Sequence, residues 1–237
     1  LEIFRENTEG EYANVGGFQY ADFPSEVGIQ AGIFTRMGCE RVIRYAFQLA
    51  QRRNKKKHLT SITKSNAQGY GMLVWDKAFE RVSSEFPDIE TDSLLVDAAA
   101  MDFIRKPESF DVVVGSNLFG DILTDIGAII TGSMGLASSA NLDPDRRYPS
   151  MFEPVHGSAP DIAGKGVANP TACILSFAMA LKYSFDLGKE AEVLENAIEK
   201  VLAKGIRTAD LMQERNKQPA STEEMGTEII NQLDFSL

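Results

Sequence analysis

Hydrophobic and polar positions along the chain change their period several times, and these changes predict its elements. The first residues are typical of a short strand that runs into a polar loop, Arg5–Tyr12. Paired glycines and the alternation in Val27–Gln30 predict a hairpin-like arm over residues 13–36. Apolar residues then recur at helical spacing between Glu40 and Arg53, which predicts a helix there.

Strand-like and helix-like patterns continue to alternate up to about the middle of the chain. The β-branched run Leu59–Thr63 predicts a strand, and helices are expected over Leu73–Phe86 and over Val96–Ile104, the second stopped by Pro107. The continuous apolar run Phe110–Val114 suits a strand that is buried on both faces. Strands that alternate with helices in this way indicate an α/β architecture.

The second half of the chain, after Gly132, combines a long loop with helices. Residues Asn141–Gly166 are rich in Pro, Gly, Asp and Ser, which predicts a loop. Asn169 and Pro170 suit a helix start, as N-cap and first helical residue, and Gly205 suits the end of a helix over Glu190–Lys204. The large apolar side chains are expected in the core, among them Phe47, Trp75, Phe79, Phe177 and Phe185.

Composition narrows the class of protein. The chain has 237 residues, 43% hydrophobic and 24% charged, with a net charge of −10. These values are ordinary for a globular protein, and the excess of acid argues against a nucleic-acid binder. No apolar stretch approaches the ~20 residues of a membrane span, so no membrane partner is expected. Two cysteines make no disulfide framework, which favours a reducing, cytoplasmic location.

The first residue also bears on processing. The chain begins with Leu1 rather than Met, and no signal peptide follows. We therefore expect a truncated chain, whose missing part could have carried any targeting segment.

Asp121 and Asp125 form the first candidate site. They are spaced to share one helix face, directly after the predicted buried strand and the segment Asn117–Gly120. Their mutual repulsion would be relieved by a hard divalent cation with carboxylate ligands. The alternative is an ordinary helix N-terminus, where aspartate suits the helix dipole.

A loop of small residues over Val155–Gly166 forms the second candidate site. Its glycines would let the backbone approach a ligand closely, although a surface loop explains them equally well. It is not a Walker A loop, and the chain has no G-x-G-x-x-G fingerprint. Lys64, directly after a predicted strand, is a base if its pKa is lowered and otherwise a surface lysine. His156 alone is more often structural than catalytic.

Five segments together resemble one family, the metal-dependent, decarboxylating dehydrogenases of isocitrate, 3-isopropylmalate and D-malate or tartrate. These segments occur in the family's order, and the chain is most similar to the tartrate/D-malate branch. They are RENTEGEY (Arg5–Tyr12), TKSN (Thr63–Asn66), NLFGDILTD (Asn117–Asp125), SANLDPD (Ser139–Asp145) and FEPVHGSAPDIAGKGVANP (Phe152–Pro170).

The resemblance implies a fold and a division into domains. The fold would be the two-domain α/β fold of isopropylmalate dehydrogenase, with a mixed parallel and antiparallel sheet and the N-terminal part of the large domain missing. Residues 1–131, including the arm 13–36, would form the small domain that dimerises and binds substrate. Residues 132–237 would form the C-terminal part of the large, coenzyme-binding domain.

The resemblance also implies roles for the candidate residues. Asp121 and Asp125 would hold Mg²⁺ or Mn²⁺ together with Asp97 from the second subunit of a homodimer. Lys64, also given across the dimer, would help to remove the substrate's hydroxyl proton, and Tyr12 would protonate the enol after CO₂ leaves. Arg5 would bind a substrate carboxylate.

The coenzyme implied by the resemblance is NAD, bound on the family's own fold rather than on a glycine fingerprint. The residues expected to bind its adenosine end are His156, Gly157, Ser158, Ala159, Asp161, Ile162 and Asn169. Hydride transfer from a 2-hydroxy diacid would give a 2-oxo acid, with decarboxylation in the case of D-malate. Alternatives are an isopropylmalate or isocitrate dehydrogenase, and a truncated subunit without activity.

Overall fold

The computed structural model describes residues 1–212 and 218–234 of the chain. These residues form two compact units, 1–127 and 128–237. The division lies inside helix α4 (Asn117–Ile130), whereas the boundary expected from the sequence lies just after this helix, between residues 131 and 132.

A four-stranded parallel sheet forms the centre of the first unit, with the strand order β1-β6-β4-β5. The strand that was predicted to be buried on both faces, β6, lies between β1 and β4, and all four of its residues are buried. It begins at Val112, because Phe110 and Asp111 belong to the preceding turn rather than to the ladder. The strands are β1 (Glu2–Arg5), β4 (His58–Thr63), β5 (Glu90–Leu95) and β6 (Val112–Gly115).

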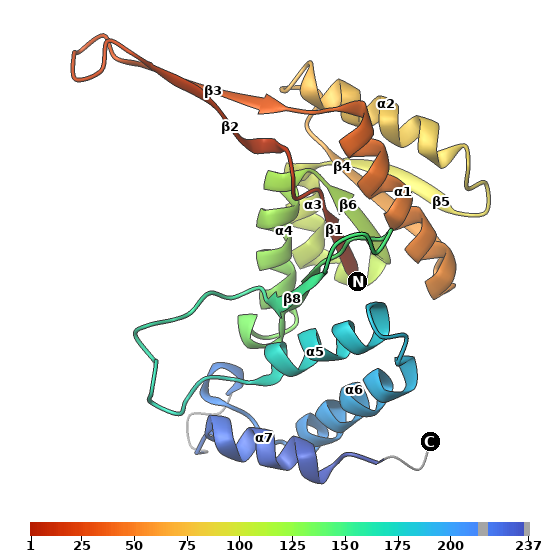
Figure 1. Cartoon of the computed structure of the whole chain (residues 1–237), viewed down its shortest axis with the longest axis vertical. Coiled ribbons are helices and arrows are strands. Elements are labelled where there is room, and N and C mark those ends of the chain that lie inside the picture. The colour runs from red at the N-terminus through yellow and green to blue at the C-terminus, as the bar shows by residue number, and fades with distance from the viewer. Residues whose placement is uncertain (213–217, 235–237) are drawn as a thin grey trace. The chain divides into compact units, whose positions relative to one another are not determined.

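Helices cover both faces of this sheet. Figure 1 shows α1 (Arg36–Arg53) and α2 (Gly71–Ser83) on one face, with α3 (Val96–Arg105) and α4 on the other. A short 3₁₀ turn, Pro107–Ser109, follows α3. The largest buried side chains between the layers include Trp75, Phe47, Phe103 and Leu123, so this unit has a continuous core of its own.

The helix boundaries that differ most from the sequence prediction are the start of α1 and the end of α2. α1 begins at Arg36 rather than Glu40, because Thr35 caps it: the Thr35 hydroxyl accepts a hydrogen bond from the Gly38 amide at 3.0 Å. α2 ends at Ser83, three residues before Phe86. In both cases the element itself is confirmed and only its end moves.

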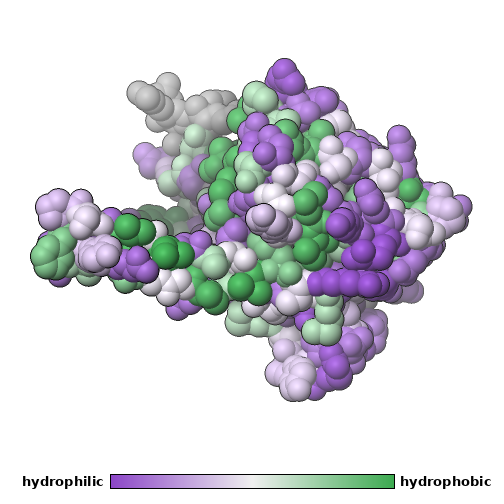
Figure 2. Space-filling view, turned by 90° about the horizontal axis from the view of Figure 1, so that it is seen from above, coloured by the Kyte–Doolittle hydropathy of each residue, from purple (hydrophilic) through white to green (hydrophobic). Residues whose placement is uncertain are grey.

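The predicted arm is confirmed as a two-stranded antiparallel ribbon, β2 (Gly10–Gln19) and β3 (Val27–Ile33), which projects from the first unit in Figure 1. Gly16 is needed there, since a Cβ at this position would lie 2.0 Å from the Ile29 carbonyl oxygen. Hydrophobic side chains remain exposed along the ribbon, as Figure 2 shows; they include Val15, Phe18, Tyr20, Phe23, Val27, Ile29 and Ile33.

The second unit packs helices against one another and against a short ribbon. α5 (Thr171–Tyr183) contacts both α6 (Gly188–Ala203) and the antiparallel pair β7 (Ser138–Asn141) and β8 (Met151–Pro154). A small core lies where α6 meets α7 (Thr222–Asn231). Two 3₁₀ turns, Met134–Leu136 and Ala209–Leu211, complete the described part of this unit.

The ends of the helices in the second unit follow their local sequence. Gly205, with φ +81°, closes α6 as predicted: its amide donates to the Leu202 carbonyl, and the next amide, of Ile206, donates to Val201. α5 begins at Thr171, one residue later than predicted. Asn169 still supplies the capping bond, because its Oδ1 accepts the Thr171 amide hydrogen at 3.0 Å.

The expected burial of the aromatic side chains holds only in the first unit. Phe47, Trp75 and Phe79 are buried, whereas Phe177 and Phe185 are 55% and 62% exposed. The expectation was wrong for Phe177 because α5 is apolar around much of its circumference, so hydrophobicity alone did not show which face packs. Phe185 lies after the end of α5, in the bend that precedes α6.

The α/β class is confirmed, with the parallel strands and the antiparallel strands in separate sheets. No helix among the described residues is both long and apolar enough to span a membrane. Cys39 is buried and Cys173 is exposed, and both are free thiols. Burial raises the pKa of the Cys39 thiol to about 12, so this side chain is an unreactive part of the core.

Candidate functional site

Four strands that run in the same direction bring the first group of candidate residues to one edge of the sheet. Arg5 ends β1, Lys64 follows β4, Asp97 follows β5, and Asn117 lies two residues beyond β6. The carboxyl ends of parallel strands are where open α/β sheets bind their ligands. This edge therefore collects the polar residues that the sequence analysis took from four separate segments.

Arg5, Tyr12 and Asp121 lie in direct contact. The Arg5 guanidinium forms an ion pair with Asp121 through Nη1 and Oδ1, and the Tyr12 hydroxyl donates to Asp121 Oδ2 at 3.2 Å. The guanidinium also lies 5.5 Å from the centre of the Tyr12 ring. The hydrogen bond to Asp121 raises the pKa of Tyr12 above its usual value, so its hydroxyl stays protonated at neutral pH.

Asp125 follows Asp121 after one turn of α4, and its side chain is exposed. Two carboxylates on one helix face provide hard oxygen ligands, and the Arg5 guanidinium shows that a positive charge is stable beside Asp121. The donor set therefore fits a divalent cation. Within residues 1–212 and 218–234, however, no three His, Cys, Asp or Glu side chains of this chain come close enough to hold a metal by themselves.

Lys64 and Asp97 form a second, separate pair. Their side chains make an ion pair, with Lys64 27% and Asp97 61% exposed. The hydrogen bond from Lys64 lowers the pKa of Asp97. The structure brings these two residues together, and it does not join Asp97 to Asp121 and Asp125 within one chain.

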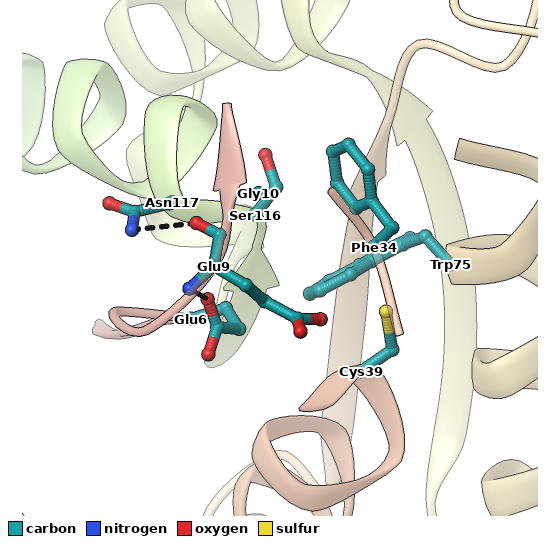
Figure 3. A pocket seen from close by; sticks show the side chains of 8 residues that line it. All are labelled: Glu6, Glu9, Gly10, Phe34, Cys39, Trp75, Ser116 and Asn117. Atoms are coloured by element: carbon teal, nitrogen blue, oxygen red, sulfur yellow. Dashed lines mark hydrogen bonds between the residues drawn. The ribbon is translucent and has the colours of Figure 1, made fainter. Parts of the chain in front are cut away.

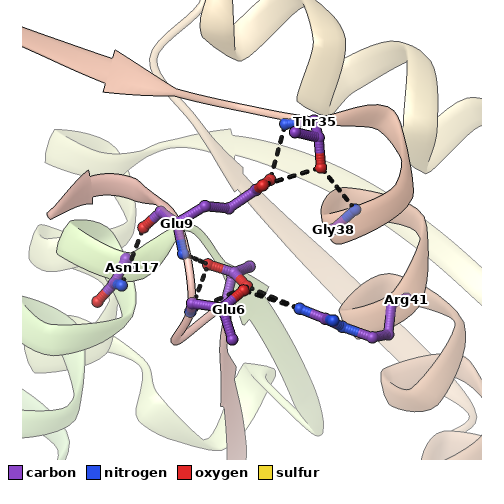
Figure 4. Close-up of polar contacts among 7 residues, drawn as sticks. Glu6, Glu9, Thr35, Gly38, Arg41 and Asn117 are labelled. Carbon is purple, nitrogen blue, oxygen red and sulfur yellow. Dashed lines mark hydrogen bonds and ion pairs between the residues drawn. The ribbon is translucent and has the colours of Figure 1, made fainter. Parts of the chain in front are cut away.

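The acidic residues of the loop after β1 hold the loop itself. Glu6, only 4% exposed, accepts hydrogen bonds from the amides of Thr8 and Glu9 and pairs with Arg41. Glu9 accepts from the amide and hydroxyl of Thr35 at 2.7 and 2.8 Å, at the start of α1, as Figure 4 shows. These carboxylates tie the loop between Arg5 and Tyr12 to helix α1.

Glu11 ties the other side of the loop to α4. Its Oε1 accepts from the Ser116 hydroxyl at 2.8 Å and its Oε2 from the Leu118 amide at 3.2 Å. Figure 3 shows that Glu6, Glu9, Ser116 and Asn117 line a narrow pocket together with side chains from the core. The loop that carries Arg5 and Tyr12 is thus anchored at both neighbouring helices.

The sequence analysis did not select Asn117, Glu9 or Glu11 individually. Their partners lie between 26 and 112 residues away in the chain, so no local spacing indicates these contacts. Asn117 also looks like an ordinary helix-start residue, which conceals its contact with Arg5. The only available signal was their position inside segments that carry the family resemblance.

The candidate coenzyme loop of the second unit is largely exposed. His156, Gly157, Ser158 and Asp161 are exposed, and Ala159 and Ile162 are partly buried. The loop is built from its own turns: the Ile162 amide donates to the Ala159 carbonyl at 3.1 Å, and the His156 ring lies 3.0 Å from the Gly157 carbonyl. Open backbone of this kind can approach a ligand closely.

Two of the candidate coenzyme residues, Ala159 and Asn169, have a distinctive local geometry. Ala159 has φ +43°, a left-handed conformation that costs energy for a residue with a Cβ. Asn169 donates from Nδ2 to Asp210 at 3.1 Å while it caps α5. Asp210 also accepts from the hydroxyls of Ser133 and Thr208, so Asn169 is held in a fixed orientation.

Comparisons with known proteins match nearly the whole chain. The family model described as isocitrate/isopropylmalate dehydrogenase matches residues 1–229. A 3-isopropylmalate dehydrogenase of Ruegeria pomeroyi is 48% identical over 100% of this chain and 65% of its own length. A tartrate dehydrogenase/decarboxylase of Pseudomonas putida is 45% identical over 98% of this chain and 63% of its own length.

A solved structure of the same family also matches nearly the whole chain. The crystal structure of isocitrate dehydrogenase from Methylococcus capsulatus superposes with a TM-score of 0.88 at 39% identity, covering 98% of this chain and 66% of that one. The chain thus spans less than two thirds of the length of the curated relatives named above.

Proposed function

The chain belongs to the isocitrate/isopropylmalate dehydrogenase family, and we propose that the protein oxidises a 2-hydroxy diacid, D-malate or tartrate, with NAD at a divalent metal. The observation that carries this proposal is the contact of Arg5, Tyr12 and Asp121 at the carboxyl edge of the parallel sheet. In this proposal the three contacting side chains are a carboxylate-binding group, a proton donor and a metal ligand. Several relatives are named tartrate dehydrogenase/decarboxylase, which favours this branch.

The metal ligands in this proposal are Asp121, Asp125 and Asp97 of the partner subunit. The bound Mg²⁺ or Mn²⁺ would supply polarisation of the substrate's hydroxyl and carboxylate oxygens, and NAD would accept the hydride. Asp121 would hold the metal in place of its present contact with the Arg5 guanidinium. Arg5, released at Nη1, then binds a substrate carboxylate through its forked donors.

Two residues move protons in the proposed reaction. Lys64 of the partner subunit takes the proton of the C2 hydroxyl as C2 is oxidised to the ketone. When D-malate loses CO₂, the electron pair of the broken C–C bond gives an enolate, and the Tyr12 hydroxyl delivers a proton to carbon. The Tyr12 hydroxyl donates a hydrogen bond to Asp121 Oδ2, so it carries the proton that this step requires.

A homodimer with shared sites follows from this assignment. Within one chain, Lys64 and Asp97 pair with each other rather than with Asp121 or Asp125. The ribbon β2–β3 exposes hydrophobic side chains, and a two-stranded ribbon is marginally stable in water. We assign the ribbon to the contact between subunits, and the first unit as a whole to dimerisation and substrate binding.

The second unit is assigned to NAD. The loop His156–Ile162 offers bare backbone, since a Cβ at Gly157 would have no heavy atom within 4 Å, and Asn169 is held in a fixed orientation beside it. Asp161 would accept hydrogen bonds from the ribose hydroxyls of the adenosine. A 2′-phosphate would meet this carboxylate, so NADP is disfavoured.

A second candidate within the same family is 3-isopropylmalate oxidation. The relative from Ruegeria pomeroyi carries that name, and it matches the whole length of this chain at 48% identity. The chemistry at Asp121, Lys64 and Tyr12 is the same in both cases, so the two candidates differ in the substrate group beyond the hydroxy acid.

The test is a turnover screen of the whole protein that contains this chain. D-malate, tartrate, isopropylmalate and isocitrate are each assayed with Mn²⁺ and with either NAD or NADP. We expect the highest kcat/KM with D-malate or tartrate and a clear preference for NAD. The highest value with isopropylmalate or isocitrate selects the second candidate or an isocitrate dehydrogenase, and no turnover with any of the four favours an inactive subunit.

A further inference from the structure

Asn117 holds one edge of the Arg5 guanidinium. Arg5 donates from Nε at 3.0 Å and from Nη2 at 2.7 Å to the same atom, Asn117 Oδ1. Asn117 is itself fixed, because it is only 4% exposed and its Nδ2 donates to the Glu9 carbonyl at 3.0 Å, as Figure 4 shows. The arginine is therefore hydrogen-bonded to a side chain whose own orientation is fixed.

The first turn of α4 surrounds Arg5 at three points. Asn117 binds the side edge of the guanidinium, and Asp121 binds Nη1 at its end. Gly120 makes room for the stem, since a Cβ there would lie 2.7 Å from Cβ and Cγ of Arg5. Because Asp121 is a metal ligand in the proposed function, Asn117 and Gly120 are the contacts of α4 that remain to fix where the end of Arg5 points.

We infer that Asn117 is a positioning residue that presents Arg5 to the substrate carboxylate. The inference rests on the proposed function, in which Arg5 binds that carboxylate. A neutral amide suits this task, because it orients the guanidinium without neutralising its charge. An aspartate in the same place would hold Arg5 as firmly but would compete with the substrate's negative charge.

Two variants of the whole protein separate orientation from charge. Asn117→Ala removes the grip, and we expect KM for D-malate to rise by about tenfold while kcat changes by less than about threefold. Asn117→Asp keeps an acceptor of the same shape, and we expect KM to rise as well, because the carboxylate repels the diacid. Direct titration of D-malate into the Mn²⁺-loaded protein without NAD should give matching losses of affinity.

A double variant tests whether Asn117 acts through Arg5. If it does, Asn117→Ala raises KM by less than about twofold in an Arg5→Gln background, since the arginine to be oriented is already absent. Ser61→Ala is the matched control: it removes the 3.0 Å hydrogen bond to the buried Trp75 in the same unit and touches neither Arg5 nor Asn117. It should lower the melting temperature and leave KM unchanged.

The results distinguish the inference from the function on which it rests. If Arg5→Gln raises KM and Asn117→Ala does not, the inference is wrong and the role of Arg5 stands. If Arg5→Gln leaves KM and D-malate affinity unchanged, the substrate role of Arg5 fails. A crystal structure of Asn117→Ala decides in either case: a displaced Arg5 guanidinium supports the grip, and an unmoved one overturns it.

Discussion

In the first unit the candidate site residues are bound to one another through their side chains, whereas in the second unit the candidate coenzyme loop is held by its own backbone turns. Arg5, Tyr12, Asn117 and Asp121 form one connected set of ion pairs and hydrogen bonds. In the described structure, the loop His156–Ile162 is held by short-range bonds such as that from the Ile162 amide to the Ala159 carbonyl, and most of its side chains are exposed.

This difference corresponds to the kinds of ligand that we propose for each unit. A small, highly charged diacid and a metal ion require charged groups at fixed positions, and a network of charged side chains gives that order before binding. An adenosine group has a large, largely neutral surface, which open glycine-rich backbone can contact closely. The same substitution should therefore have different effects in the two units.

The largest effect is expected when one charge is removed from the first unit. Asp125→Asn deletes a proposed metal ligand, and we expect Mn²⁺ affinity and Mn²⁺-dependent turnover to fall by more than the 10–100-fold that is typical for partners outside the ligand shell. Because Asp125 is exposed, its loss should leave the melting temperature nearly unchanged.

The comparison between the units provides the control for this experiment. Asp161→Asn makes the same chemical change in the exposed loop of the second unit. It should leave Mn²⁺ affinity unaltered and alter only the preference between NAD and NADP. Wild-type Mn²⁺ affinity in the Asp125 variant, measured by titration calorimetry, would remove this residue from the metal site.

The next largest effect concerns Lys64, which pairs with Asp97 rather than with Asp121 in its own chain. Tyr12→Phe and Lys64→Ala should each be nearly inactive. After subunit exchange, half of the dimers are hybrids with one fully wild-type site, so the mixture should regain about a quarter of wild-type activity if the sites are shared. Exchange is followed with two affinity tags, and proven exchange without any recovery argues that Lys64 acts within its own subunit.

The sequence predicted the elements of the fold better than the network of the site. Local periodicity was sufficient for the parallel strands β1, β4 and β6, for the ribbon β2–β3 and for the closing Gly205 of α6, because each depends on residues close in the chain. It did not predict β5, and it predicted a loop over Asn141–Gly166 where the structure has the strand β8. The contacts of Arg5 with Asn117 and Asp121 join residues 112 and 116 positions apart. Only the family resemblance predicted a common site for such distant residues.

Burial could be predicted where one face of an element is clearly apolar. Trp75 and Phe79 lie on the apolar face of α2 and are buried as expected. Phe177 is exposed although it lies on α5, because an almost uniformly apolar helix gives no periodic signal for its packed face. Phe185 is exposed because it lies in the bend after α5. In the charged loop after β1 the difficulty is another one: the sequence shows the charged residues but not which distant residues they contact.

The smallest effect is expected from Asp210, the residue of the second unit that most resembles the network of the first. Burial raises the pKa of Asp210, but hydrogen bonds from Ser133, Thr208 and Asn169 outweigh it, so the net pKa lies below the usual 3.8. A lowered pKa in the folded state means that this carboxylate stabilises the fold above about pH 4. That contribution is lost as the pH falls through the lowered pKa.

Asp210→Asn should therefore lower the stability of the second unit by about 1 kcal/mol at pH 7, a small value because the residue is partly exposed. The difference in melting temperature between wild type and variant should shrink as the pH falls from about 3.8, where the unfolded carboxyl takes up a proton, through the lowered pKa of the folded state. Asp186→Asn is the matched control, since Asp186 pairs with Arg146 at the surface of the same unit and its loss should hardly change the melting temperature. A difference between wild type and Asp210→Asn that stays constant from pH 7 to pH 3 would show that the amide disturbs packing rather than charge, and the second unit would then contain no counterpart to the charged network of the first.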